Sequence, residues 1–273
     1  MLSDAHAHPF DLSRLYGGAE AERRRLNIIC AASAWRAEEF LYNERAASVF
    51  PMALCFAVHP QLPASGNAAR DSKPIQDSLS FMYKLAGEKR IDAVGETGFD
   101  LYNDEFRATE KIQDELFEHH LCIAEKHELP LVLHLRRAEQ KIFSYTKRLK
   151  KITSVVFHSY QGTADEAAAL LRRGVNAYFS FGTTILLNHK KAMKSCAALE
   201  AERLLFETDA PYQSLRGNAY SSYADINSVI QKASELRSGA EQAPVKADEL
   251  AEIAGMNFYA VYKKRLNDET GRI

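Results

Sequence analysis

Leu129-Pro-Leu-Val-Leu-His134 and Ser154-Val-Val-Phe-His158 are two short apolar runs, and each of them ends in a histidine. Between them, Ile142 to Leu149 has the spacing of an amphipathic helix. A short apolar run, a helix and a second apolar run are typical of two parallel strands joined by a crossover helix. This stretch therefore predicts a β/α unit.

The same alternation extends along the rest of the chain. Eight apolar runs are predicted as strands: Leu2 to His8, Asn27 to Ala32, Ala53 to Val58, Ile91 to Glu96, Leu129 to His134, Ser154 to His158, Ala177 to Phe181 and Leu204 to Asp209. Longer segments have the spacing of helices: Glu38 to Ala47, Ile112 to His127, Ile142 to Leu149, Ala164 to Leu171, Tyr223 to Leu236 and Glu249 to Leu266. Stretches 60–74 and 238–247 are predicted as loops. Eight such alternations in 273 residues predict an α/β fold that is a single TIM-type (β/α)8 barrel.

An open doubly wound sheet is the competing α/β architecture. Such sheets often carry a glycine-rich phosphate-binding motif, and neither G-x-G-x-x-G nor a Walker-type sequence occurs in this chain. No shift in composition and no internal repeat marks a boundary between domains. We therefore expect one barrel domain that spans residues 1–273.

The overall composition is that of an ordinary globular protein, with 46% hydrophobic and 26% charged residues. The formal net charge of -1 provides no global positive field for nucleic acid, so any site for a polyanion must be local. The first residues lack a basic region followed by an apolar one, and no segment approaches the roughly 18 apolar residues of a membrane span. The four cysteines occur singly, which indicates reduced thiols. These features predict a cytoplasmic protein with no membrane association and no obligate protein partner.

The first predicted strand contains the motif Asp4-Ala-His6-Ala-His8. Alternate side chains of a strand share a face, so His6 and His8 project from the same side with their backbones about 7 Å apart. Both imidazoles can then reach one metal ion. Taken alone, the motif is more simply interpreted as two unrelated histidines, because two-residue motifs arise often by chance.

Ionisable residues also end four other predicted strands: Glu96, His134, His158 and Asp209. In a barrel the carboxyl ends of all strands meet on one face, where the loops build the active site. Taken singly, each residue has a structural interpretation as a bonded core residue, an N-cap or the partner of an arginine. Taken together with His6 and His8, they predict a metal site.

The charge of this ligand set indicates a reaction. Four neutral imidazoles and two carboxylates carry about -2, so two divalent cations would leave about +2 for a hydroxide and an anionic substrate oxygen. This balance suits a phosphodiester, whereas one cation gives a nearly neutral site that suits an amide or ester. With two cations, Glu96 is the expected bridge, and Asp209 is expected to orient and deprotonate the water.

Six motifs carry a resemblance to a known family: Asp4-Ala-His6-Ala-His8, Ala57-Val-His59-Pro60, Val94-Gly-Glu96-Thr-Gly98-Phe-Asp100, Leu133-His134-Leu-Arg136, Phe157-His158-Ser-Tyr-Gln-Gly162 and Glu207-Thr-Asp209-Ala-Pro-Tyr212. Together the sequence resembles the TatD-type metal-dependent deoxyribonucleases of the amidohydrolase superfamily, from residue 1 to about 262. It departs from the usual pattern at Gln61, at Ser159-Tyr160 and in the loop 213–219, and all six candidate ligands are present.

The resemblance implies a TIM barrel that holds two divalent cations. Glu96 would bridge the ions, and Asp209 would bind the first ion and act as general base. The histidines would divide into two pairs, His6 and His8 on one ion and His134 and His158 on the other. Family members are described as magnesium-dependent nucleases, often removing nucleotides from the 3′ end of single strands. The imidazole-rich ligand set favours Zn²⁺, Mn²⁺ or a similar ion on chemical grounds, so the choice among Mg²⁺, Mn²⁺ and Zn²⁺ stays open.

Three further residues are candidate contacts to a substrate phosphate. Arg136 follows His134 by two residues and shares its face, His59 ends the third predicted strand, and Arg216 lies in the loop after the eighth. Each has an alternative interpretation as a surface or ion-pair residue. The expected partner of these side chains is nucleic acid as substrate, with single-stranded DNA favoured.

Aromatic and basic residues near the same face give weaker signals. Four tyrosines have the position to stack on bases or to line the core: Tyr102, Tyr160, Tyr178 and Tyr212. The basic run 189–194 either contacts a nucleic-acid backbone or, more simply, forms a solvated helix face. His120 is expected on a helix as a surface or packing residue.

Two other functions compete with a nuclease. A metal-dependent amide, lactone or ester hydrolase on the same scaffold is favoured if one ion binds and the barrel mouth is apolar. A non-catalytic protein that uses metal only for rigidity is the other. In that case Asp209→Asn would change little in function, whereas an enzyme would lose its turnover.

Overall fold

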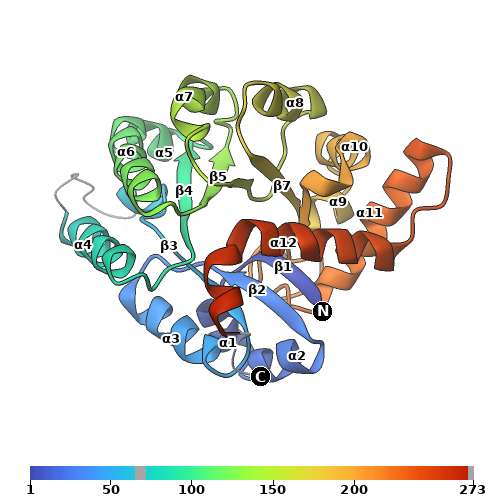
Figure 1. The fold of residues 1–273 in the computed structure, drawn as a ribbon, viewed down its shortest axis with the longest axis horizontal. Helices are drawn as coiled ribbons and strands as arrows, with labels where there is room; N and C mark the ends of the chain where they lie inside the picture. Colours follow the sequence, from blue (N-terminus) through green and yellow to red (C-terminus); the bar gives the residue numbers. More distant parts are fainter. Residues whose placement is uncertain (65–71, 270–273) are drawn as a thin grey trace.

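The computed structural model describes residues 1–64 and 72–269, and beyond Tyr262 it describes the helical backbone alone. Eight parallel strands lie side by side in the order of the chain (Figure 1). Their bounds are β1 Leu2–Ala7, β2 Ile28–Ala32, β3 Met52–Phe56, β4 Ala93–Asp100, β5 Leu131–Arg136, β6 Val155–Phe157, β7 Ala177–Phe181 and β8 Leu204–Phe206. The predicted (β/α)8 barrel is therefore confirmed.

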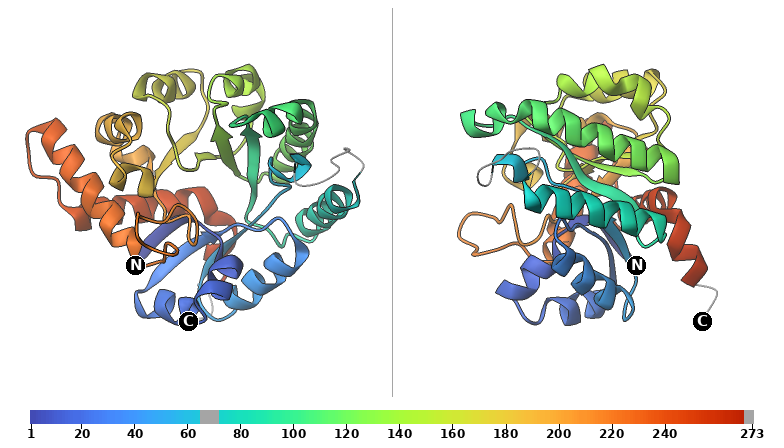
Figure 2. Two further views of the ribbon diagram at one scale, coloured as in Figure 1. Left: turned by 180° about the vertical axis from the view of Figure 1, so that it is seen from behind. Right: turned by 90° about the vertical axis from the view of Figure 1, so that its left-hand side faces the viewer.

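Helices follow the strands and form the outer ring of the barrel (Figure 2). The α-helices are α1 Pro9–Leu15, α2 Ala19–Arg25, α3 Ala37–Ala47, α4 Lys73–Gly87, α5 Asp104–Ala108, α6 Glu110–His127, α7 Thr146–Leu149, α8 Ala164–Arg172, α9 Thr183–Leu186, α10 Lys190–Ala198, α11 Asp225–Glu241 and α12 Ala247–Glu269. Short 3-10 turns are η1 Leu62–Ala64, η2 Lys141–Tyr145 and η3 Ala201–Arg203. None of the described helices is long and apolar enough to cross a membrane.

The first and last strands meet through the backbone at the carboxyl end of the barrel. The Asp209 N–H donates to the His6 carbonyl at 2.9 Å, and the His8 N–H donates to the Ala210 carbonyl at 2.7 Å. These bonds join segments at opposite ends of the sequence. They also fix the position of the backbone at two predicted metal ligands, His6 and Asp209.

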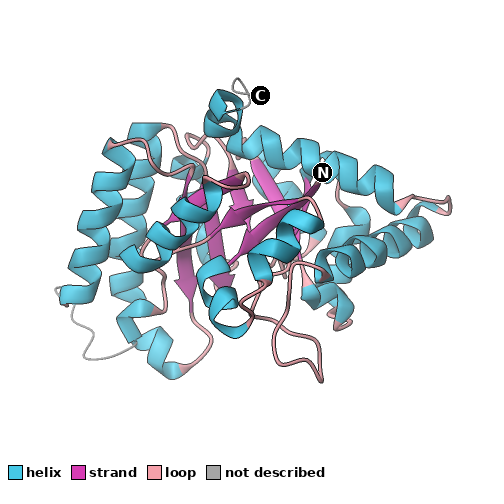
Figure 3. Cartoon of the chain, turned by 90° about the horizontal axis from the view of Figure 1, so that it is seen from below, coloured by secondary structure: helices cyan, strands magenta, loops and turns pink. Residues whose placement is uncertain are grey.

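The opposite, amino end of the barrel is filled by apolar side chains. Val132, Val156 and Leu205 are fully buried inside it and pack in one cluster with Phe258 and Tyr262 of α12. Helix α12 lies across this end of the strands, as Figure 3 shows. The barrel is therefore a packed core at this end, and space for a ligand is left at the carboxyl end.

Two strands extend further than predicted, whereas β8 ends at Phe206, three residues before its predicted end. β4 continues past Glu96 to Asp100, and β5 continues past His134 to Arg136, so that Asp100 pairs with Arg136. The extension of β4 contains Gly98, and glycine is depleted in strands, so the sequence beyond Glu96 lacks a clear strand pattern. Gly98 has a φ of 129°, and a Cβ there would collide with the His134 carbonyl, so glycine lets the two strands stay paired.

The two predicted loops also differ from the structure. The first, 60–74, contains η1 and ends inside α4, and its residues 65–71 lie outside the described residues. The second, 238–247, is shorter than expected because α11 continues to Glu241. Ser238 supports this extension, since its backbone stays helical while its hydroxyl accepts a hydrogen bond from the Val245 N–H at 2.9 Å.

Candidate metal centre at the carboxyl ends of the strands

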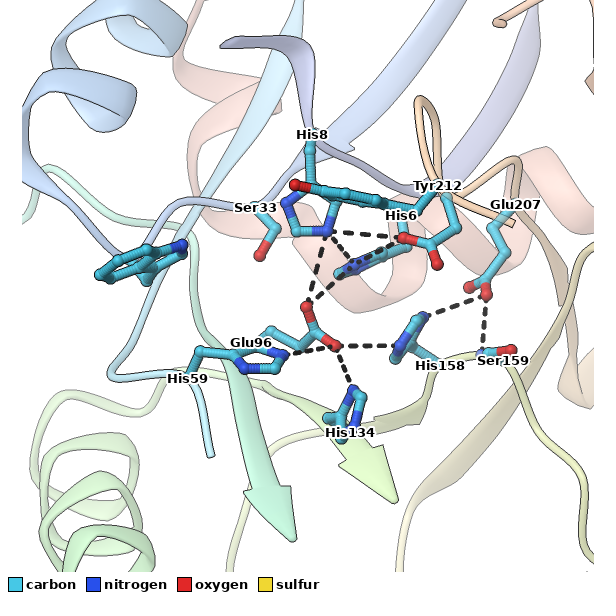
Figure 4. Close-up of polar contacts among 12 residues, drawn as sticks. His6, His8, Ser33, His59, Glu96, His134, His158, Ser159, Glu207 and Tyr212 are labelled. Atoms are coloured by element: carbon cyan, nitrogen blue, oxygen red, sulfur yellow. Dashed lines mark hydrogen bonds and ion pairs between the residues drawn. The ribbon is translucent and has the colours of Figure 1, made fainter. Parts of the chain in front are cut away.

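A cavity of about 480 Å³ opens at the carboxyl ends of the strands. Predicted ligands from five different strands or strand ends surround it: His8, Glu96, His134, His158 and Asp209. His6 lies just beneath them and is 2% exposed. Figure 4 shows the side chains of His6, His8, Glu96, His134 and His158 pointing toward one another. All six candidate ligands from the sequence are thus brought together.

His6 and His8 converge as their alternating positions predict. Their Nε2 atoms lie 3.2 Å apart. Both nitrogens face Asp209, at 3.6 Å and 3.5 Å from its Oδ1 atom. Both also face Glu96, at 3.3 Å and 3.6 Å from its Oε2 atom. One end of the cluster is therefore a set of two imidazoles and two carboxylate oxygens around a common point.

The other oxygen of Glu96 faces a different set of imidazoles. Its Oε1 atom lies 2.6 Å from His134 Nδ1 and 3.0 Å from His158 Nε2. His59 Nε2 approaches the same oxygen at 3.3 Å. Glu96 thus lies between two groups of candidate metal ligands and presents one carboxylate oxygen to each.

The donor chemistry fits divalent cations. Three groups of ligand atoms lie within 4.8 Å of one another: His6 with His8 and Asp209, His6 with Glu96 and His158, and His59 with Glu96 and His134. Imidazole nitrogen and carboxylate oxygen are common ligands of Zn²⁺ and related ions. A hydrogen bond between the two Nε2 atoms requires a proton on one of them, whereas a cation between the rings is bound by both lone pairs. The arrangement therefore suits metal ions.

Both carboxylates are held in the charged form. Burial by itself would raise the pKa of Glu96, but the imidazoles of His59 and His158 outweigh it and keep this pKa well below its usual value. Burial also opposes ionisation of Asp209, but the hydrogen bond with His8 and the nearby imidazoles lower its pKa. The site therefore presents two negative charges at neutral pH.

The imidazoles fall into two classes. Burial lowers the pKa of His6 and of His59, which favours the neutral form that binds metal. For His158, burial is outweighed by Glu207 and Glu96, and the pKa is raised well above its usual value. For His134, burial is likewise outweighed, by Asp100 and Glu96, and the pKa is raised. Protons on these two rings compete with a cation, so metal binding weakens in acid.

Buried polar groups behind the ligands hold them in place. Glu207 Oε1 lies 3.1 Å from His158 Nδ1 and accepts a hydrogen bond from the Ser159 N–H at 2.7 Å. This contact directs His158 Nε2 toward Glu96. The sequence motif contained Glu207, yet its role was missed, although a carboxylate two residues before Asp209 on an apolar strand was a visible signal.

His120 is a second buried residue that holds the site in place, although the sequence predicted only a surface or packing role for it. It is 1% exposed on α6. Its Nε2 accepts the Val58 N–H at 3.1 Å, so its Nδ1–H donates to the Thr97 hydroxyl. His120 therefore ties the residue before His59 to the residue after Glu96.

The family model of the TatD related DNases matches residues 3–263 of the chain. The chain belongs to this family. The "Uncharacterized metal-dependent hydrolase YjjV" of Escherichia coli (strain K12) is 27% identical over 269 residues, which cover 95% of this chain and 96% of that protein. The crystal structure of YjjV superimposes with a TM-score of 0.78 at 26% identity, covering 96% of this chain and 98% of that one.

Other relatives match over a smaller part of the chain. The "Uncharacterized metal-dependent hydrolase MJ1582" of Methanocaldococcus jannaschii is 28% identical over 179 residues, 66% of each chain. A "3'-5' ssDNA/RNA exonuclease TatD" of Dickeya dadantii is 32% identical over 140 residues, which cover 50% of this chain and 51% of that protein. The chain thus spans between about half and two thirds of the length of these curated relatives.

The residues that depart from the usual TatD pattern lie in or beside the cavity. The Gln61 side-chain amide donates to Asp100 at 2.6 Å. The Gln213 amide donates to Asp209 Oδ2 at 2.6 Å and to the Ser159 hydroxyl at 3.0 Å. By donating to Asp100 and Asp209, these two amides fix the orientation of the carboxylate groups at and beside the candidate ligands. The departures therefore change the hydrogen bonds around the site and leave the ligand set intact.

The three predicted substrate contacts take different places in this TatD-family barrel. His59 lines the cavity beside Glu96. Arg136 lies at the rim, with a 46% exposed side chain and its Nη1 atom 4.0 Å from Asp100 Oδ2. Arg216 is exposed on the loop after β8 and is not among the described residues that line the cavity.

Two of the four tyrosines are unsuited to stacking on a ligand. Tyr160 is 5% exposed and Tyr178 is 8% exposed, because both pack into the core. Tyr102 and Tyr212 are exposed at the carboxyl end of the barrel, at 42% and 49%. Trp35, which follows β2, also lines the cavity. It was missed in the sequence because a lone aromatic residue after a strand carries no specific pattern.

Proposed function

We propose that the protein is a metal-dependent phosphodiesterase that removes nucleotides from the 3′ end of single-stranded nucleic acid, with DNA as the favoured substrate. The observation that carries the proposal is the position of Glu96, whose two oxygens face two separate groups of donors. A carboxylate in this position suits a pair of cations that act on one phosphate. The family membership and the relative named as a 3'-5' ssDNA/RNA exonuclease support it.

We assign each ligand to one of two divalent cations. Asp209 belongs to the first cation, and Glu96 is shared between the two. The histidines complete the sites, His6 and His8 on the first cation and His134 and His158 on the second. The many imidazoles favour Zn²⁺ or Mn²⁺ over Mg²⁺, which prefers oxygen ligands.

The cations would supply acidification of a water molecule and stabilisation of negative charge on the attacking and leaving oxygens. Asp209 is ionised at neutral pH, so it can accept the proton of that water. The Gln213 amide donates a hydrogen bond to Asp209 Oδ2, which directs the other oxygen of Asp209, Oδ1, toward His6 and His8. We assign His59 and Arg136 to the non-bridging phosphate oxygens and keep Arg216 as a contact to the strand outside the cavity.

The lining of the cavity favours a phosphodiester over a small apolar ester, amide or lactone. Among the described residues that line it, Leu135 is the single aliphatic side chain. An apolar substrate would leave the polar side chains of the wall without partners, at a cost in binding. A charged phosphate and the polar edges of a nucleotide satisfy them.

The test is hydrolysis of a 5′-labelled single-stranded oligonucleotide by protein stripped with a chelator and then titrated with Mg²⁺, Mn²⁺ or Zn²⁺. We expect one of these metals to restore a ladder that shortens from the 3′ end, and Glu96→Ala and Asp209→Asn to abolish it. A circular single strand is the matched control, because it offers no 3′ end. Metal-loaded protein that binds two ions and leaves the linear strand whole would overturn the proposal in favour of a small ester, amide or lactone.

His59 allows a sharper test of the assignment. Its Nε2 atom lies 3.3 Å from Glu96 Oε1, and His134 and His158 already supply two nearer imidazoles to that oxygen. We expect His59→Asn to lose turnover and to keep two bound ions in a metal count. Loss of one ion would make His59 a ligand.

A further inference from the structure

A second cavity, of about 540 Å³, adjoins the metal centre. Its walls come from the segments after β4, β5 and β6 and from the start of α10. Leu135, Arg136 and Gln161 line both cavities, so the two are contiguous along this edge. We call the second cavity the basic groove, defined by Tyr102, Arg136, Arg137, Lys190 and Lys191.

The basic groove concentrates positive charge in a chain whose net charge is -1. Arg136, Arg137, Lys190 and Lys191 face it, and Glu139 is the one carboxylate among its described lining residues. Within the described chain, Lys190 and Lys191 are exposed and have no ion pair. Their charges are therefore free to bind an anionic ligand.

Tyr102 holds the two arginines of the groove in place. The Arg136 guanidinium lies 3.7 Å from the centre of its ring, and the Arg137 guanidinium lies 4.6 Å away. Arg137 Nη1 also donates to the Tyr102 carbonyl at 2.9 Å. Stacked guanidinium groups lose less freedom on binding than free ones, so this arrangement is pre-organised for phosphate.

The groove is also the side by which a strand can leave the metal centre past an excess of positive charge. On the opposite rim, the Tyr212 hydroxyl donates to the Asp11 carboxylate at 2.9 Å. Asp11 in turn lies 3.9 Å from Arg36, which Glu39 also binds. The cation on that rim is thus already neutralised, whereas Lys190 and Lys191 are not.

We propose that the basic groove binds the backbone of the nucleotides on the 5′ side of the scissile phosphate. This inference rests on the proposed function, because a 3′-terminal nucleotide in the metal centre requires the rest of the strand to leave through an adjoining surface. Each lysine would contact one phosphate of the strand, and Arg137 would stack on or hydrogen-bond to the first nucleotide outside the cavity, next to Arg136 at the scissile phosphate. The ligand class is a single-stranded oligonucleotide of more than a few residues.

The test compares two charge-matched double variants in the Asp209→Asn background, where cleavage is suppressed. Lys190→Gln with Lys191→Gln removes two charges from the groove. Lys150→Gln with Lys151→Gln removes two exposed charges just before β6, at the amino end of the barrel. The affinity for a fluorescent single-stranded dodecanucleotide and for a dinucleotide is measured with metal between about 0.05 and 0.3 M salt.

We expect the groove variant to bind the dodecanucleotide about tenfold more weakly at low salt and to lower the slope of log K against log salt by about 1.4, since each phosphate contact on a single strand contributes about 0.7. The loss on the dinucleotide should be much smaller, and the Lys150 and Lys151 variant should match its parent. Equal slopes in the two variants, or an equal loss on both ligands, would overturn the proposal.

Substitution of Tyr102 provides an independent test of the groove. Tyr102→Phe keeps the ring that the arginines stack on and should bind the dodecanucleotide as its parent does, whereas Tyr102→Leu should bind about threefold to tenfold more weakly. Equal binding by both variants would overturn the role of the ring.

The outcomes separate this inference from the proposed function. If the unmodified protein leaves the oligonucleotide whole while the slopes still differ as expected, the groove stands and the cleavage proposal falls. If it cleaves the strand and the slopes agree, cleavage stands and the groove falls.

Discussion

Two levels inside the barrel differ completely in chemistry although they lie on the same strands and the same face. Val132, Val156 and Leu205 form the lower level, in one apolar cluster with Phe258 of α12. The second, upper level consists of the residues two positions further along the same three segments: His134, His158 and Glu207. A step of two residues in a strand returns to the same face, so the change from core to site takes one repeat of the pleat.

The comparison shows how charged groups are kept inside a fold at no great cost. In the lower level each side chain needs only a neighbour of the right shape, because it has no polar atoms. In the upper level each polar atom needs a partner, and several have one behind them: Glu207 for His158, and Thr208 for Asp4. The lower level therefore stabilises the fold, and the contacts of the upper level orient the side chains of the site.

The largest expected effect is on activity and follows from a single atom change in the upper level. Glu96→Gln keeps the shape of the side chain and removes the charge that both donor groups share. We expect hydrolysis of the oligonucleotide to fall by about 10³-fold or more, because in the proposed assignment both cations lose a ligand charge. Glu252→Gln, on an exposed face of α12, is the control and should keep full turnover. A Glu96→Gln protein with a tenth of the normal rate would contradict a shared carboxylate.

The matching change in the lower level should act on stability. Phe258 is fully buried between α12 and the barrel interior. Phe258→Ala should lower the free energy of unfolding by about 3–5 kcal/mol, through lost burial and a cavity. Urea unfolding followed by circular dichroism measures this. The turnover of the folded fraction at low temperature should stay normal, and a selective loss of turnover at unchanged stability would break the division between the levels.

A smaller effect is expected from the support behind a ligand. Glu207→Gln keeps a hydrogen-bond acceptor for the Ser159 N–H but loses the charge that orients His158. We expect metal affinity to fall by about tenfold to 100-fold, which is the usual effect of removing a residue behind a metal-bound histidine. Titration calorimetry with Zn²⁺ or Mn²⁺ measures it. An unchanged affinity would mean that His158 is held by packing alone.

The smallest effect is a dependence of stability on pH. Burial, together with the neighbouring His119, lowers the pKa of His120 from 6.5 to about 3. The unfolded chain then takes up a proton below pH 6.5 that the folded chain refuses, so this stabilising contribution is complete above pH 6.5 and is lost as pH falls toward 3.

We expect the free energy of unfolding, with chelator present, to drop between about pH 7.5 and 5.5 by about 1.4 kcal/mol more in the unmodified protein than in His120→Gln. Urea titrations at the two pH values measure this difference. Parallel pH profiles would show that His120 titrates normally in the folded state.

The sequence was most informative where chemistry and periodicity coincide. β7 was predicted with its observed bounds, Ala177–Phe181, because it is a short apolar run between polar segments. The six candidate ligands could be proposed because each of them is an ionisable residue in or just after such a run, and the structure brings them together. The barrel then follows from the number of runs, since their carboxyl ends share one face.

Residues that act through another residue were harder to find. His120 lies on the buried face of an amphipathic helix beside Phe117 and Leu121, and its partners Val58 and Thr97 are distant in the sequence. Pairing across such distances has no local pattern, because it depends on how the elements pack. The length of β4 was missed for the same reason, since its extension depends on contact between Gly98 and the neighbouring strand.

The backbone bonds between the start of the chain and the segment after β8 have a consequence for synthesis. Asp209 N–H to His6 and His8 N–H to Ala210 join parts of the chain that leave the ribosome at opposite ends of translation. Domains are made from the amino terminus onward, and contacts between distant segments form late. His6 of β1 and His8 directly after it therefore exist from the first moments of synthesis without Asp209. A nascent chain cannot assemble this site, and it becomes competent for metal only when the eighth strand has emerged and docked.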